Sequence, residues 1–348
     1  MLGRTASASE GPRAGSLRAG SPRSESPRAG SSGDGLVQQR SAPAQLIAVG
    51  SGKGGVGKSF LVSNLGALLA RDGFRTVVVD ADLEGANLHT WLGLPQPHRS
   101  LADFVARREE DVEKLLIDTA TPNLQLIAAT HGNLVSPQPG HARRVQLARA
   151  LRQLDADFVI LDLGAGTQAA VIDYFMVADA GVVVVAPEPT SVENAYSFIR
   201  AAFYRRLHLA MISHEMRKVV ATAMDQRNER GIRTPLDLLR EIRSADPEEG
   251  VRFSETVRAF QPRIVVNEAR TAEDVRLGFS IASVCRKYFG IEAQYVGYVN
   301  YDPAARQSVR GRRSLVDTHP RSDAAVYLLR IARKLAALRA PTERSAAP

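Results

Sequence analysis

The chain has 348 residues and a formal net charge of +8, from 45 basic and 37 acidic side chains. Its single cysteine, Cys285, excludes a disulfide framework and any multi-cysteine metal or iron–sulfur site made within one chain. The sequence contains no run of about 18 apolar residues, so no membrane-spanning helix is predicted. A secretory signal requires an apolar segment after its basic residues, and none follows the N-terminal arginines. The basic balance favours nucleic acid or an anionic membrane surface as partner. The alternative is an arginine-rich composition without functional charge.

Residues 1–44 are rich in Ser, Pro, Gly and Arg and contain no aromatic side chain. Such a segment buries too little apolar surface to offset its ordering entropy, so we expect it to be disordered, as we do the short polar tail 341–348. Six arginines against three acidic residues make the first segment basic. It is either a tether that touches DNA or lipid, or a solubilising tail.

A phosphate-binding loop follows the first strand. The apolar run Leu46–Val49 predicts that buried strand, and the apolar periodicity of Phe60–Leu69 predicts a helix. Between them lies G-x-x-x-x-G-K-[ST], with its defining residues at Gly52, Gly57, Lys58 and Ser59. Glycines let backbone N–H groups close around phosphate oxygens, and the helix N-terminus adds partial positive charge. The lysine supplies a cation for the phosphates and the serine hydroxyl can ligate Mg²⁺. The loop therefore predicts a nucleotide site.

Two later strands end in carboxylates. The strand Arg75–Val79 leads to Asp80 and Asp82, and the strand Phe158–Asp162 ends in an acid before a glycine-rich turn. Because ligands of open α/β sheets bind at the carboxyl ends of the strands, acids there can hold a metal shell and orient an attacking water. The competing interpretation is that they are turn or cap residues.

Strand-like and helix-like segments alternate along most of the chain. Further strands are predicted at Asn123–Ala129, Ala180–Ala186, Arg263–Asn267 and Tyr295–Val299. Further helices are predicted at Ser100–Leu116, His141–Leu154, Ala272–Phe289 and Ser322–Leu338, a short helix or turn at Leu88–Leu94, a loop at Pro137–Gly140, and a helix after Pro187–Ser191 through Ile199. This alternation predicts an α/β fold with a doubly wound, mostly parallel sheet flanked by helices.

Residues 204–262 break that rhythm and predict a helical insertion or lid. Its expected elements are a helix at Leu207–Met224, with a short strand at Val219–Ala223, and short helices at Pro235–Arg243 and Ser254–Phe260. Elsewhere, a basic loop is expected at Val309–Arg313. The arginines of the helix His141–Leu154 are expected to face water rather than DNA: Arg143, Arg144, Arg149 and Arg152.

Several motifs resemble the MinD/ParA (SIMIBI) ATPases. The segment Lys53–Ser59 is similar to their deviant P-loop, and Asp80–Asn87 with Leu92–Leu94 is similar to their second motif. The segment Pro187–Tyr196 looks more like the flagellar-placement FlhG branch than MinD. Matches at 266–270, 297–302 and 320–325 continue the resemblance, which covers about residues 45–340 apart from the insertion and implies one P-loop NTPase domain over that range.

The resemblance implies roles for individual residues. Lys53 is the signature lysine that reaches the partner subunit's nucleotide in an ATP-bound sandwich dimer, and with Lys58 and Asp82 it forms the catalytic set, in which Asp82 orients the hydrolytic water. The metal shell is implied at Ser59, Asp80 and Asp162, and Asn267 reads the adenine edge with Arg270 beside it. The implied nucleotide-binding residues are Gly52, Lys53, Gly54, Gly55, Val56, Gly57, Lys58, Ser59, Phe60, Asn267 and Arg270.

The resemblance also implies a function: a Mg²⁺-dependent ATPase acting as a spatial switch for flagellum or division-site placement. An ATP-bound homodimer would attach to the inner membrane or nucleoid, and an activating partner would trigger hydrolysis and return it to the cytoplasm. A ParA-like DNA-partitioning ATPase is one alternative, with a basic surface at Arg306, Arg310, Arg312 and Arg313. The other alternative is a metabolic or metal-insertion ATPase of this fold. It is disfavoured because iron–sulfur carriers of this fold need several cysteine ligands and the chain has only Cys285.

Three departures qualify the resemblance. Phe60 replaces the hydroxyl residue that usually contacts the α-phosphate, no N-terminal activation helix like that of FlhG is visible, and the insertion is extra. In the last helix Ala325, Leu328, Leu329, Ala332 and Leu335 share one face. This helix matches the last core helix of the family, so the resemblance implies core packing. A membrane role would instead place Arg330, Arg333, Lys334 and Arg339 on the lipid side.

Overall fold

The computed structural model describes residues 42–83, 85–129, 140–224, 232 and 234–339. The predicted tails at 1–44 and 341–348 lie outside these residues, apart from 42–44, and so does most of the predicted loop Pro137–Gly140. Domain boundaries therefore stay a prediction.

In the described part of the chain, eight strands form one sheet in the order β3-β4-β2-β5-β1-β6-β7-β8. They are β1 (Gln45–Ser51), β2 (Thr76–Asp80), β3 (Leu116–Asp118), β4 (Leu124–Ile127), β5 (Phe158–Ala165), β6 (Ala180–Val185), β7 (Arg263–Ala269) and β8 (Gln294–Asn300). All neighbours run parallel except β3 and β4. The predicted doubly wound, mostly parallel sheet is confirmed.

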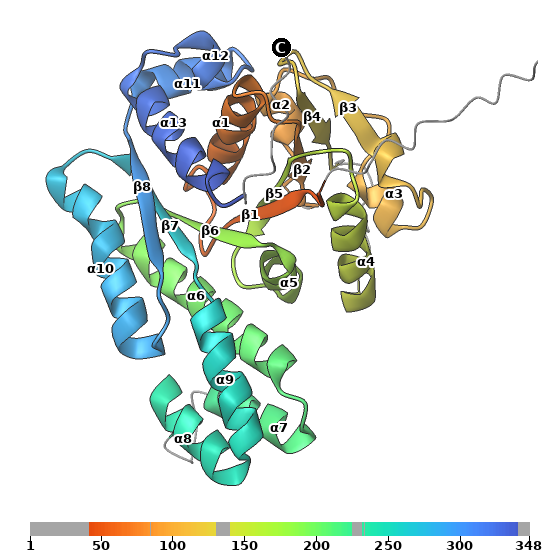
Figure 1. Ribbon diagram of the computed structural model, residues 1–348. Helices are drawn as coiled ribbons and strands as arrows, with labels where there is room; N and C mark the ends of the chain where they lie inside the picture. The colour runs from red at the N-terminus through yellow and green to blue at the C-terminus, as the bar shows by residue number, and fades with distance from the viewer. Residues whose placement is uncertain (1–41, 84, 130–139, 225–231, 233, 340–348) are drawn as a thin grey trace, which may run out of the picture. The chain divides into compact units, whose positions relative to one another are not determined.

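Helices cover both faces of this sheet (Figure 1). They are α1 (Lys58–Arg71), α2 (Leu88–Trp91), α3 (Leu101–Val105), α4 (His141–Arg152), α5 (Ala169–Val177), α6 (Pro189–Ala210), α7 (His214–Met224), α8 (Pro235–Ala245), α9 (Pro247–Ala259), α10 (Ala272–Phe289), α11 (Pro303–Arg310), α12 (Leu315–Thr318) and α13 (Asp323–Ala336), with a 3₁₀ helix η1 (Val112–Leu115).

Two cores result from the strand period of two. In β1, Leu46 and Ala48 join the core beneath α4, α5, α6 and α10, whereas Ile47 and Val49 join the core beneath α1 and α13. Because both faces are covered, the central strands are apolar throughout, which is why they are readable in the sequence as continuous apolar runs.

The predicted helix Ser100–Leu116 is wrong beyond its first turns. It ends at Val105, and Arg107 adopts a left-handed backbone conformation with φ 59°. Asp111 then caps η1 by accepting a hydrogen bond from the Glu113 N–H at 3.0 Å, and the chain continues into the antiparallel edge strand β3. Local side-chain to backbone bonds therefore outweigh the helical periodicity here.

The expectation for the α4 arginines is correct for Arg149, which is exposed, and wrong for Arg143 and Arg144, which are buried. The Arg143 guanidinium lies 3.9 Å from the centre of the Phe104 ring and bonds the Phe104 carbonyl. Arg144 pairs with the buried carboxylate of Asp173. These partners lie on other elements, so the helix pattern by itself does not reveal them.

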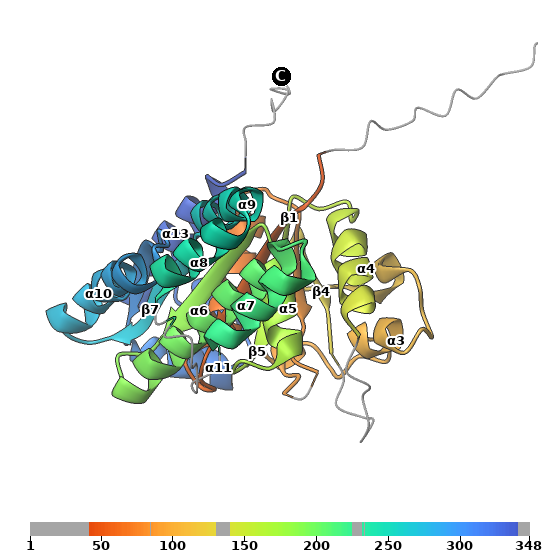
Figure 2. The same ribbon diagram turned by 90° about the horizontal axis from the view of Figure 1, so that it is seen from below.

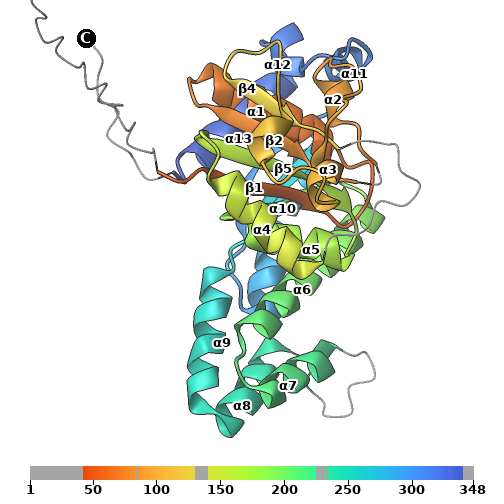
Figure 3. The same cartoon turned by 90° about the vertical axis from the view of Figure 1, so that its right-hand side faces the viewer.

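The insertion is helical, as predicted, but its elements differ. The helix α6 runs far past Ile199, Val219–Ala223 belongs to α7 rather than to a strand, and α9 begins at Pro247 because Asp246 caps it. In Figures 1 and 3, α7, α8 and α9 lie together on the side of α6 away from the sheet. Figure 2 shows α8 and α9 beside α6 and α7 from below.

The C-terminal helix α13 packs in the core. Leu328, Ala332 and Leu335 are buried against α1 and β8, which confirms the core interpretation. Arg339, which the alternative membrane role would place on the lipid side, pairs with Asp157 at 2.7 Å. The predicted basic loop Val309–Arg313 is partly wrong, because α11 extends to Arg310. None of the described helices is both long enough and apolar enough to cross a bilayer.

Candidate nucleotide-binding site

The glycine-rich loop joins β1 to α1, as predicted. Gly57 has φ 94° and precedes the first residue of α1; a Cβ there would lie 2.2 Å from the Asn267 amide nitrogen. A Cβ at Gly52 would lie 1.9 Å from the Asn194 carbonyl oxygen. Backbone conformation at the first position and close approach at the second therefore require glycine.

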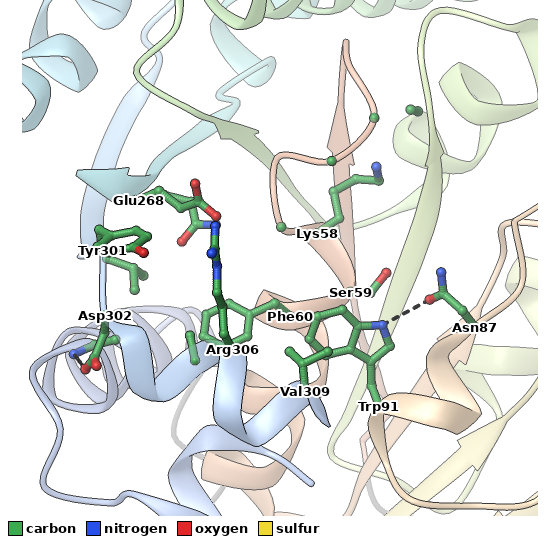
Figure 4. Close-up of a pocket in the computed structure, with 18 of the residues that line it drawn as sticks. Lys58, Ser59, Phe60, Asn87, Trp91, Glu268, Tyr301, Asp302, Arg306 and Val309 are labelled. Atoms are coloured by element: carbon green, nitrogen blue, oxygen red, sulfur yellow. Dashed lines mark hydrogen bonds between the residues drawn. The ribbon is translucent and has the colours of Figure 1, made fainter. Parts of the chain in front are cut away.

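A cavity of about 590 Å³ opens beside this loop (Figure 4). One side is formed by the loop and the start of α1, at Gly54, Gly55, Gly57, Lys58, Ser59 and Phe60. The other is formed by the carboxyl ends of β7 and β8 and by α11, and includes Asn267, Tyr301 and Arg306. Of the predicted nucleotide-binding residues, Gly52, Lys53, Val56 and Arg270 do not line it. Its volume falls in the range of small-molecule and cofactor sites.

Buried ionisable groups gather at the strand ends. Asp80 and Asp162 are register partners on the neighbouring strands β2 and β5, and they are 1% and 2% exposed. Burial, with the charge of Asp162, raises the pKa of Asp80 to about 8. Burial raises the pKa of Asp162 to about 7, although Ser59 and Lys58 oppose this rise. Burial also lowers the pKa of Lys58 against the opposing charges of Asp162 and Asp82. Of these groups Lys58 lines the cavity, and the two acids are buried behind it; perturbed groups gathered at a cavity in this way point to a functional site.

The carboxylate oxygens of Asp80 and Asp162 differ in their hydrogen bonding. Both oxygens of Asp80 accept backbone hydrogen bonds, from Asp82 at 3.2 Å and from Asn87 and Leu88 at 3.0 Å each. In Asp162, the nearby Ser59 hydroxyl favours the charged form, while Oδ1 is buried without a hydrogen-bond partner among the described residues. An unpartnered carboxylate oxygen beside a serine hydroxyl fits the hard oxygen donors that Mg²⁺ requires. Asp80 instead shapes the loop that carries Asp82.

Asp82 stands between two cavities. It lines the large cavity and also a second one of about 350 Å³. Its carboxylate accepts a hydrogen bond from the Gly85 N–H at 2.8 Å. A Cβ added to Gly85 would lie 2.8 Å from a carboxylate oxygen of Asp82, so this glycine leaves room for the carboxylate.

Lys53 points away from the cavity of its own chain. Its ammonium lies 2.7 Å from a carboxylate oxygen of Glu188 and 3.1 Å from the Thr190 hydroxyl, at the start of α6. The amide nitrogen of Asn267 donates to the Val56 carbonyl at 2.9 Å. The remaining polar atom of that side chain is therefore an acceptor, Oδ1, on a residue that lines the cavity.

Several cavity residues are absent from the sequence-based set. Trp91 packs edge-on against Phe60, with ring centres 6.2 Å apart, and its indole N–H donates to Asn87 at 3.2 Å. Phe60 thus belongs to an aromatic wall. Arg306 lies near Tyr301, whose ring also carries Arg270 at 3.7 Å. Two signals in the sequence could have identified these residues. Trp91 comes shortly after the acidic motif, and Tyr301 comes at the end of the last strand.

The mostly parallel sheet and the glycine-rich loop define a P-loop NTPase. Its buried acids, Asp80 and Asp162, lie at the carboxyl ends of the neighbouring strands β2 and β5. The ParA family model, described as NUBPL iron-transfer P-loop NTPase, matches residues 43–229, which is more than half of the chain. The chain therefore belongs to the ParA family of P-loop NTPases.

Individual proteins and solved structures give a more specific comparison than the family model. The chain is 28% identical to the antiactivator FleN of Pseudomonas aeruginosa over 295 residues, 84% of this chain and 86% of FleN. It is 28% identical to the flagellum site-determining protein YlxH of Helicobacter pylori over 178 residues, 49% of this chain and 58% of YlxH, less than two thirds of that relative. The septum site-determining protein MinD of Pyrococcus horikoshii, solved with Mg-ADP, shares the fold with a TM-score of 0.58 and 18% identity over 86% of this chain and all of that one. The predicted membership of the MinD/ParA P-loop NTPases is confirmed, and flagellum- and septum-site-determining proteins are among the proteins similar to this chain.

Proposed function

We propose that this chain binds ATP with Mg²⁺ in the large cavity and hydrolyses it to ADP and phosphate. One observation carries the proposal: the buried Asp162, with an unpartnered carboxylate oxygen, lies against Ser59 and Lys58 at the start of α1. Leaving these charges buried without a ligand costs free energy, which a bound Mg²⁺-nucleotide would offset.

Each residue of the site has a chemical task in this proposal. Ser59 and Asp162 would hold the metal, which when bound neutralises negative charge on the phosphates. The Lys58 ammonium donates to phosphate oxygens from the N-terminus of α1. Asp82, held by Gly85 between the two cavities, accepts a proton of the attacking water and orients it. Asn267 accepts a hydrogen bond from the adenine amino group, a donor that guanine lacks at that position.

The site is completed by a second copy of the chain. Lys53 cannot serve its own cavity while it pairs with Glu188 and Thr190. In an ATP-bound dimer it would exchange these partners for the phosphates of the opposite subunit, where a second cation stabilises charge that develops during hydrolysis. The Mg-ADP bound to the structurally similar MinD supports a nucleotide in the cavity of each subunit, and the Lys53 contacts support the dimer.

The biological role follows from the relatives and from the charge. Proteins named for flagellum and septum site determination are similar to this chain, and a net charge of +8 favours an anionic surface. We infer an ATPase that attaches to such a surface, membrane or nucleoid, as an ATP-bound dimer. An activating protein then stimulates hydrolysis and releases it, so that the chain marks a position reversibly.

A Lys53→Ala substitution tests the shared site. We expect Asp82→Ala to bind ATP, hydrolyse it slowly and accumulate as a dimer in light scattering after size exclusion. Adding Lys53→Ala to it should return a monomer, and Lys53→Ala by itself should lower phosphate release at least tenfold. Lys114→Ala, an exposed lysine on η1, is the matched control. If Lys53→Ala dimerised with ATP and kept full activity, the shared site would be wrong.

The iron-transfer activity in the family model's description has little support in this chain. Cys285 is its one cysteine, and it is fully buried. Burial raises the pKa of this thiol to about 12, so the thiolate that ligates iron would be scarce at neutral pH.

A further inference from the structure

A groove between α6 and α9 lies outside the nucleotide site. It has a volume of about 460 Å³, and its walls are Met176, Arg206, Leu209, Glu255, Thr256 and Ala259. We call it the α6–α9 groove. Arg206 and Leu209 belong to α6, and Glu255 and Ala259 face them from α9.

Apolar side chains cluster at one end of the α6–α9 groove. Among the described residues, seven large apolar side chains are exposed, and three of them are Leu209 (46%), Ile212 (66%) and Val251 (55%). The Glu249 carboxylate at the start of α9 accepts from the Ile212 N–H at 2.8 Å, which brings these helix ends together. Val251 precedes Glu255 by four residues and so lies on the same stripe of α9. A concentration of exposed apolar side chains of this kind marks an interaction surface.

Two opposite charges, Arg206 and Glu255, lie at the other end of the groove, and neither has an ion pair among the described residues. Arg206 is half-buried, and this burial lowers the pKa of its guanidinium. The guanidinium lies 5.9 Å from the centre of the Phe260 ring. No carboxylate of the described residues, Glu255 included, lies within ion-pair distance of it. Glu255 likewise has no ion pair among those residues. A half-buried cation without a counter-ion is unfavourable unless a partner supplies one.

We propose that the α6–α9 groove is a two-fold interface with a second copy of this chain. A two-fold contact presents the same patch from both sides, so Arg206 of each copy would meet Glu255 of the other. An acidic partner would satisfy Arg206 but repel Glu255, and a basic partner would do the reverse. A self-complementary contact satisfies both charges twice and covers Leu209, Ile212 and Val251 at the same time.

This interface differs from the ATP-dependent one and does not require it. The helix α6 begins beside Lys53, through Glu188 and Thr190, and carries the groove near its other end. Its 22 residues correspond to about 33 Å. A chain with two separate two-fold interfaces assembles beyond a dimer when both form, so ATP would convert groove-linked dimers into larger species.

The test is sedimentation of the full chain, free of nucleotide, over a concentration series. We expect reversible dimers. Arg206→Glu or Glu255→Arg should each weaken association about tenfold or more, because like charges then oppose across the axis. The double variant R206E/E255R should restore it, and so should mixing the two single variants. Arg149→Glu, at an exposed position of α4 outside the groove, is the control and should leave association unchanged.

Two results would overturn the interface: a wild-type chain that stays monomeric throughout the series, or single charge reversals that associate as well as wild type. Because nucleotide is absent, neither result depends on the proposed ATPase. Conversely, if Lys53→Ala still forms the nucleotide-free dimer, the two interfaces are separate; loss of that dimer in Lys53→Ala would contradict the groove.

Discussion

Asp162 shows how a single residue serves function against stability. It lies at the end of a central strand, where burial is nearly complete, and one of its oxygens has no hydrogen-bond partner among the described residues. Burial favours the protonated acid and raises its pKa to about 7. A purely structural position would carry an apolar residue here, so the carboxylate is best explained by the cation it would hold.

This reasoning predicts the stability of Asp162→Asn in the absence of nucleotide. The unfolded carboxyl titrates near pH 3.9. Because the folded state holds its proton up to about pH 7, wild type loses stability as the pH rises from about 4 to 7, and the amide does not. The variant should therefore be the more stable protein at pH 8, by on the order of a few kcal/mol, and the difference should vanish near pH 4. Thermal unfolding across that range measures it.

The control for this prediction is Asp118→Asn, an exposed carboxylate on β3. Its substitution should change the free energy of unfolding by no more than about 0.5 kcal/mol at any pH. A wild type as stable as Asp162→Asn at pH 8 would show that the burial of Asp162 is compensated in solution.

At the scale of elements, a buried carboxylate joins three helices. Asp173 on α5 is 1% exposed and accepts from Arg205 of α6 at 2.7 Å, from Arg144 of α4, and lies 3.2 Å from the His141 ring nitrogen. These contacts hold the Asp173 pKa below its ordinary value against the opposing effect of burial. They fix how α4, α5 and α6 pack on one face of the sheet.

Asp173→Asn should therefore be strongly destabilising. The substitution leaves Arg144 buried without its carboxylate, and breaking one partner of a buried ion pair costs about 3–5 kcal/mol. Urea unfolding followed by circular dichroism gives the value. Arg149→Ala, on the exposed face of the same α4, should stay within about 0.5 kcal/mol of wild type. Equal small effects from both variants would mean that the cluster adds nothing to stability.

How far the sequence predicts these elements depends on where the information lies. The central strands and α1 were predictable because burial on both faces produces apolar runs, and the phosphate loop has a local signature. The acids at the ends of β2 and β5 follow from the same strands. By contrast, the burial of Arg143 and Arg144 depends on Phe104 and Asp173, which are distant in sequence. The break at Arg107 depends on local capping bonds that compete with helical periodicity.

Site residues outside motifs were harder to predict for a related reason. Trp91, Tyr301 and Arg306 reach the cavity from α2, the end of β8 and α11, so only the assembled sheet brings them together. Phe60 was identified as a departure from the usual hydroxyl. Its meaning, an edge-on partner for Trp91, requires the position of α2.

At the scale of the whole molecule, some of the excess positive charges lie at the nucleotide cavity and others lie on the outer surface, where they could contact DNA. Four arginines of one short region, Arg306, Arg310, Arg312 and Arg313, are predicted from the sequence to bind DNA. In the structure the first two line the nucleotide cavity, and the last two lie beyond it on the exposed turn after α11. The same stretch of chain therefore presents two kinds of cation.

Paired substitutions separate these roles. Arg306→Ala with Arg310→Ala should weaken ATP binding about tenfold, because each removes a cation beside the phosphates or base. Arg312→Ala with Arg313→Ala should leave ATP affinity unchanged. Trp91, the one tryptophan of the chain, lines the cavity and reports ATP binding by fluorescence. If the exposed pair contacts DNA, its removal should weaken non-specific binding and reduce the slope of log affinity against log salt by about 2. Loss of DNA binding with unchanged ATP affinity in the Arg306 and Arg310 variant would reverse this division and return the whole cluster to the nucleic-acid surface.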